Sequence, residues 1–172
     1  MARNNTKRPL YTEDERRRRD ESRWTLVQAV LAPLQFLVFL VSFALVIRFL
    51  TTGDGYFAAT LSVVFKTLIL YVIMITGSVW EKAVFGRWLF ASSFFWEDVV
   101  SMLVLALHTA YLAALFLGIL EARYLMILAL GAYCAYVINA TQFLLKLRSA
   151  RIQQTQRAEA PSHAPSAGYA VE

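Results

Sequence analysis

The sequence predicts an all-α integral membrane protein built as a bundle of four transmembrane helices. Of its 172 residues 58% are apolar and the mean hydropathy is +0.50, whereas soluble domains are usually about 45–50% apolar. The excess lies in four long runs, each able to cross about 30 Å of hydrocarbon at about 1.5 Å per residue. Most Lys and Arg residues lie beside these runs, at the two ends of the chain.

The chain begins with a polar arm, residues 1–23, which we expect to be cytoplasmic. Thr12 and Glu15 fit a capping box, and the residues that follow predict a short charged helix over about 13–22. This arm is too rich in charge to be a cleavable signal peptide.

A membrane domain is expected over residues 24–150. Its spans are predicted at about 24–50, 57–80, 97–120 and 124–145. The lone Cys134 lies in an apolar run and is interpreted as a packing residue. The tail over 151–172 should be basic at first and then disordered, because its Ala, Pro and Ser residues have little to bury.

The distribution of Lys and Arg predicts how the protein is oriented. Basic residues fill the arm, the connection between the second and third spans, and the segment after Leu145, while the two short turns hold or border only Arg48 and Arg123. Both termini should therefore be cytoplasmic, in an up-down bundle. Because the basic residues follow the membrane topology, they argue against binding to nucleic acid.

The third span carries polar residues on one helical face. The spacing of 4-3-4-3 places five residues on a single stripe: Glu97, Ser101, Val104, His108 and Tyr111. Ionisable residues inside a membrane usually face the bundle interior and mark function. The alternative is that His108 is a hydrogen-bonded core residue.

Other polar residues gather toward the cytoplasmic half. Glu81 ends the second span, and Asn139, Gln142 and Lys146 form a stripe on the fourth. Lys66 lies deeper and is expected either to snorkel outward or to pair with a carboxylate. Asn139 and Gln142 have an alternative role as interhelical hydrogen-bonding groups.

Three carboxylates flank the same connection: Glu81, Glu97 and Asp98. We expect them to line a polar pocket near the cytoplasmic headgroups, with His108 at its floor. The alternative is that they are charges at helix ends, where acids favour the start of the third helix. That alternative is stronger for Asp98 than for Glu97.

The connection itself, WEKAVFGRWLFASSFFWED, is rich in aromatic residues. Trp88 and Trp96 fit an interfacial aromatic belt, and they also fit a wall for a planar, amphipathic ligand. Arg87 and Lys82 could bind the carboxylate of such a ligand.

The sequence also excludes several chemistries. No pair of His residues on facing spans could hold haem, no Cys/His cluster predicts a metal, and no nucleotide-binding or serine-hydrolase motif is present. We therefore expect no cofactor and no metal site, and an enzyme here would work with side-chain acids, bases and water.

Five long stretches, spread over residues 9–150, resemble the 3-vinyl bacteriochlorophyllide hydratase family of photosynthetic bacteria, named 2-vinyl in older usage. They are PLYT (9–12), VLAPLQFLVF (30–39), TGSVWEKAVFGRWLF (76–90), FFWEDVVSMLVLALHTAYL (94–112) and YVINATQFLLKLR (136–148).

The resemblance implies a hydro-lyase reaction in bacteriochlorophyll synthesis. Water would add to the C3 vinyl group of a chlorophyllide to give a 1-hydroxyethyl group. The implied partners are a magnesium tetrapyrrole, the lipid bilayer and other enzymes of this pathway. The implied location is the bacterial inner membrane, including its intracytoplasmic extensions, as a multi-pass protein.

On this reading the residues suggest a mechanism. A neutral carboxylic acid, Glu97 by preference, would protonate the terminal vinyl carbon. His108 or a nearby carboxylate would activate water, and Asn139 and Gln142 would orient it. Alternatively, His108 would ligate the magnesium of the substrate.

Two other classes compete with a hydratase. A tetrapyrrole carrier or assembly protein would bind pigment through His108 without changing it. A small proton-coupled transporter would place its key acid mid-span, whereas here the acids gather at one interface.

Overall fold

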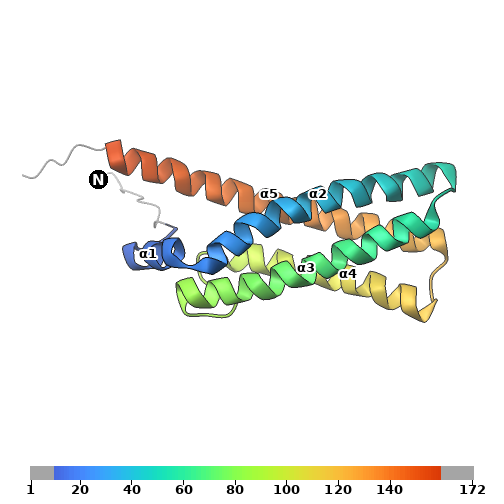
Figure 1. Cartoon of the computed structure of the whole chain (residues 1–172), viewed down its shortest axis with the longest axis horizontal. Coiled ribbons are helices and arrows are strands. Elements are labelled where there is room, and N and C mark those ends of the chain that lie inside the picture. Colours follow the sequence, from blue (N-terminus) through green and yellow to red (C-terminus); the bar gives the residue numbers. More distant parts are fainter. Residues whose placement is uncertain (1–9, 160–172) are drawn as a thin grey trace, which may run out of the picture.

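The structure, a computed structural model, describes residues 10–159, and α-helix is the regular secondary structure throughout that range. The described residues form four long helices and one short helix, and Figure 1 shows the long helices running antiparallel with the short helix at one end of the bundle. The helices are α1 (Glu13–Glu21), α2 (Arg23–Thr52), α3 (Tyr56–Phe85), α4 (Phe95–Leu117) and α5 (Ala122–Glu159). The four long helices are each long and apolar enough to cross a membrane, which confirms the predicted four-helix membrane bundle.

The short helix α1 begins at the capping box expected from the sequence. The Thr12 hydroxyl accepts a hydrogen bond from the Glu15 backbone N–H, and the Glu15 carboxylate accepts one from the Thr12 backbone N–H. These bonds satisfy two backbone donors that a helix start leaves unpaired.

The ends of the long helices differ from the expected boundaries. α3 continues to Phe85 and α4 stops at Leu117, where Gly86 and Gly118 adopt left-handed conformations that end each helix. α5 runs on to Glu159 instead of ending near residue 145, because the chain has no Gly or Pro between Gly131 and Pro161. The disorder expected after residue 159 lies outside the described residues.

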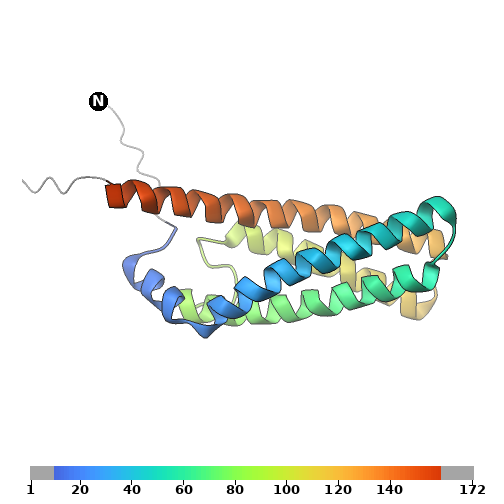
Figure 2. The same ribbon diagram turned by 45° about the horizontal axis from the view of Figure 1, so that its top comes forward.

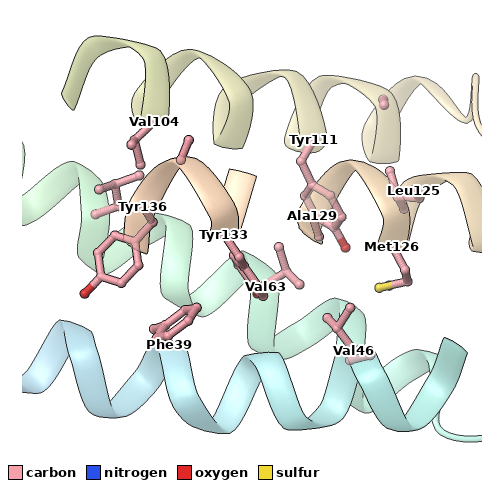
Figure 3. Close-up of a cluster of buried hydrophobic side chains, with 14 residues drawn as sticks. Phe39, Val46, Val63, Val104, Tyr111, Leu125, Met126, Ala129, Tyr133 and Tyr136 are labelled. Carbon is pink, nitrogen blue, oxygen red and sulfur yellow. The ribbon is translucent and has the colours of Figure 1, made fainter. Parts of the chain in front are cut away.

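Aromatic and small residues fill the interior of the bundle (Figure 3). Phe39 of α2 lies against Tyr133 and Tyr136 of α5, with ring centroids 5.4 Å and 5.0 Å apart. Val104 and Tyr111 of α4 are fully buried beside them. The outer surface of the bundle is apolar, as a lipid-facing surface requires.

One end of the bundle carries α1, the end of α5 and the connection from residue 86 to 94 (Figure 2). The turns between α2 and α3 and between α4 and α5 lie at the opposite end (Figure 1). The predicted orientation requires this arrangement, and the assignment of the first end to the cytoplasm stays a prediction.

Candidate active site

Glu81 and Asp98 meet at the end of the bundle where α3 stops and α4 starts. Their exposed fractions are 5% and 4%, and the backbone N–H groups that they bind belong to adjacent residues, so the two carboxyl groups are close neighbours. Two ionised carboxylates at this separation repel strongly, and the repulsion is relieved when one of them carries a proton. A proton shared between the two groups would therefore stabilise the pair.

The connection between the two helices wraps around this carboxyl pair. The backbone N–H of Phe90 donates to Asp98 Oδ2 at 2.8 Å, and that of Ala91 donates to Glu81 Oε2 at 3.2 Å. Phe90 adopts a left-handed conformation with φ of 59°, which costs a non-glycine residue about 1–3 kcal/mol. Phe90, the residue with the strained backbone, is thus also the residue whose N–H donates to Asp98.

Glu97, the residue before Asp98, contacts α5. Its Oε2 lies 2.5 Å from Lys146 Nζ, and the same ammonium lies 4.9 Å above the Phe94 ring. This contact ties the Glu97 carboxylate to α5. The stripe predicted on α4 is nevertheless confirmed, because all five of its residues are buried.

A second polar cluster lies deeper, around Lys66 and His108, which are both fully buried. The Val104 carbonyl lies 2.8 Å from His108 Nδ1 and can only accept, so Nδ1 carries the proton. His108 Nε2 then accepts a hydrogen bond from Lys66 Nζ at 2.9 Å. The Lys66 ammonium also lies 4.2 Å above the Tyr136 ring, a favourable cation–π arrangement.

This geometry separates His108 from the carboxylates. Asp98 and His108 are ten residues apart on α4, which is about 15 Å along the helix axis. Both ring nitrogens of His108 are occupied by protein groups, so binding water or magnesium would require breaking the contact with Lys66. Both expectations for Lys66 are wrong, since it neither snorkels nor pairs with a carboxylate.

Amide side chains lie between the two clusters. Asn139 Nδ2 donates to Ser101 Oγ at 2.8 Å, one turn from Asp98. Asn139 Oδ1 and Gln142 Oε1 are buried and have no hydrogen-bond partner among the described residues. Buried acceptors are normally paired, so these two oxygens have spare capacity for a water molecule or a ligand.

The predicted binding residues of the connection lie on the surface at the same end. Trp88 and Trp96 are 59% and 70% exposed, and Arg87 is exposed as well. The Lys82 ammonium donates to the Gly86 carbonyl at 3.1 Å and lies 5.9 Å from the Trp88 ring. These four side chains form an exposed aromatic and basic rim beside the buried carboxyl pair.

Two features of the site escaped sequence reasoning. The backbone donors at Phe90 and Ala91 cannot be recognised from residue identity, because every residue except proline has a backbone N–H group. The partnership of Lys66 with His108 depends on how α3 crosses α4. Within the described residues, no three His, Cys, Asp or Glu side chains are grouped to hold a metal ion.

Fold and site together define a multi-pass helical membrane protein with a buried pair of carboxyl groups at one end of its bundle. Comparison with known proteins specifies the class further. Residues 11–149 match the family described as 2-vinyl bacteriochlorophyllide hydratase (BCHF), and the chain belongs to this family.

Two curated relatives carry the name 2-vinyl bacteriochlorophyllide hydratase. The protein of Rhodobacter capsulatus is 63% identical over 150 residues, which cover 87% of this chain and 87% of the relative. The protein of Cereibacter sphaeroides is 62% identical over 145 residues, which cover 84% and 90%. No solved structure matches the chain.

Proposed function

We propose that this protein is the hydratase that adds water to the vinyl group of a bacteriochlorophyllide, giving a 1-hydroxyethyl group. The observation that carries this proposal is the identity of more than 60% with two named hydratases over most of the chain. The membrane bundle suits the substrate, because a planar macrocycle with one carboxylate tail partitions to a membrane interface. We place the protein in the bacterial inner membrane, where enzymes handling the same pigments are candidate partners.

The carboxyl pair supplies the chemistry of such a reaction. The neutral member of the pair donates its proton to the terminal vinyl carbon, and the positive charge that develops on the inner carbon is delocalised into the macrocycle. Water attacks that inner carbon while the ionised member takes the proton that the water loses. One C–H and one C–O bond form, while the C=C π bond and one O–H bond of water break. The proton then passes between the two carboxyl groups to restore the starting state, and no redox cofactor is needed.

The surrounding residues bind and orient the reactants in this scheme. Trp88 and Trp96 pack against the macrocycle, and Arg87 and Lys82 meet its carboxylate. Asn139 and Gln142 offer their spare oxygens to the attacking water. Glu97, held by Lys146, and His108, held by Lys66, shape the electrostatics of the site.

Conversion of the substrate tests the proposal directly. The chain is produced in a bacterium that makes no chlorophyll, and its membranes are incubated with the vinyl chlorophyllide. Chromatography and mass spectrometry should show a product heavier by one water, absent from membranes without the protein. Pigment that co-purifies unchanged with folded protein would instead support the carrier alternative.

A further inference from the structure

The N-terminal arm is packed against the site end of the bundle. Tyr11 is 4% exposed, and its ring stacks on Phe85 with centroids 5.7 Å apart and also lies 6.3 Å from Phe94. The Arg19 guanidinium covers the other side at 4.8 Å. Burial raises the pKa of Tyr11 above its ordinary value of 10.0, so the phenol stays neutral at physiological pH.

Hydrogen bonds tie the arm to both sides of the connection. The Arg18 Nε donates to the Val84 carbonyl at 2.9 Å, just before the connection starts. The Ser93 hydroxyl donates to the Leu10 carbonyl at 3.0 Å, just before α4 starts. The arm thus bridges the last turn of α3 and the first residues of α4.

The segment held in this way, residues 86–94, contains the two backbone donors of the carboxyl pair. Phe90 needs support from its surroundings, because its left-handed conformation is strained and such conformations persist only where neighbouring contacts fix them. Tyr11 packs on Phe85, just before the segment, and on Phe94, the last residue of the segment. A connection fixed at both ends has little freedom to move its N–H groups away from the carboxyl pair.

We infer that Tyr11 is a positioning residue for the hydratase reaction: its ring locks the 86–94 connection so that the Phe90 and Ala91 N–H groups stay on Asp98 and Glu81. This inference rests on the proposed function for its catalytic consequence. Its structural consequence, a connection fixed by the arm, stands without that function. Tyr11 acts on the carboxyl pair through the connection and not by direct contact.

Hydrogen exchange and kinetics on the full-length protein in lipid nanodiscs test the inference together. Tyr11→Ala removes the ring, Tyr11→Phe keeps it, and Tyr124→Ala removes an exposed ring at the opposite end of the bundle. For Tyr11→Ala we expect amide exchange in residues 86–94 to rise by about tenfold or more through local opening. Exchange in the interior of α3 and α4 should stay unchanged.

The kinetic result should parallel the exchange result. Tyr11→Ala should lower kcat by about tenfold or more because the carboxyl pair is misplaced, with little change in KM, since the exposed rim is intact. Tyr11→Phe and Tyr124→Ala should match the parent protein in both measurements.

Unchanged exchange in residues 86–94 of folded Tyr11→Ala protein would overturn the inference, and so would unchanged kcat despite faster exchange. If the parent protein itself fails to hydrate the substrate, the proposed function fails, while the exchange data still decide whether Tyr11 holds the connection.

Discussion

Two pairs of ionisable side chains inside the bundle, Glu81 with Asp98 and Lys66 with His108, differ in whether they are free to transfer a proton. Glu81 and Asp98 accept hydrogen bonds from the N–H groups of adjacent residues, Ala91 and Phe90, and a proton shared between the two carboxyl groups would let the pair both donate and accept. His108 donates one nitrogen to a carbonyl and offers the other to Lys66, so neither nitrogen is free to act. At the scale of single residues, we therefore propose that the carboxyl pair carries the proton chemistry.

Neutral replacements of the carboxyl pair test this assignment. Asp98→Asn and Glu81→Gln each keep an oxygen for the backbone donors but remove proton transfer, so turnover should fall by about 10²- to 10⁴-fold. Glu121→Gln, in the exposed turn at the opposite end, is the control and should leave turnover unchanged. Product formation in membranes with matched protein amounts gives the rates, and full turnover by either site variant would remove that residue from the mechanism.

The ion pair between Glu97 and Lys146 should contribute to stability more than to proton transfer. Glu97→Gln and Lys146→Met should each destabilise the fold, and the double variant should lose less than the sum, with a coupling of about 0.5–3 kcal/mol. Denaturation in detergent measures the coupling. If Glu97→Gln instead abolished turnover in fully stable protein, Glu97 would be the acid.

If Lys66 and His108 serve each other as hydrogen-bonding partners, the stability lost by replacing His108 should return when Lys66 is replaced as well. His108→Leu leaves the Lys66 ammonium without its acceptor, which should cost at least about 1–3 kcal/mol. Adding Lys66→Met removes the stranded charge and should restore most of the stability and the turnover. A stable His108→Leu protein without turnover would instead make His108 the catalytic base.

At the scale of elements, the sequence predicted the features that depend on residues close together in the chain. Four apolar runs, a capping box at Thr12 and the stripe on α4 each depend on residues within a few positions of one another. The contacts of the site depend on how helices cross: Glu97 finds Lys146 rather than His108, and Phe90 aims its N–H at Asp98. Such contacts join distant residues and depend on tilt angles that periodicity does not encode.

Two glycines provide a matched test of the connection. Gly86 and Gly118 have φ angles of 77° and 63°, and an added Cβ would meet nothing within 4 Å at either position. Gly86→Ala and Gly118→Ala should therefore cost similar stability, about 1–2 kcal/mol from backbone strain alone.

Their effects on activity should differ. Gly86 starts the connection that carries the backbone donors, so Gly86→Ala should also slow turnover, whereas Gly118→Ala at the opposite end should not. Thermal melting and product formation on the same samples separate the two effects. Equal turnover in the two variants would contradict the role given to the connection.

At the scale of the whole molecule, the site end of the bundle should face the cytoplasm. In a Cys134→Ala background, Ser92→Cys lies in the exposed part of the connection and Asp54→Cys in the exposed turn at the opposite end. A membrane-impermeant thiol reagent applied to spheroplasts should label Cys introduced at position 54 and not at position 92. The reverse labelling would invert the predicted orientation.

The reaction in isotopically labelled water is the most direct test that this protein adds water to the vinyl group. Membranes carrying the protein are incubated with the vinyl substrate in D₂O and, separately, in water enriched in ¹⁸O. Hydration of the vinyl group should give a product with one deuterium bound to carbon in the new methyl group in D₂O, and a product with one ¹⁸O in the new hydroxyl group in the enriched water. An unchanged vinyl pigment, or an oxygen atom that does not come from water, would contradict it.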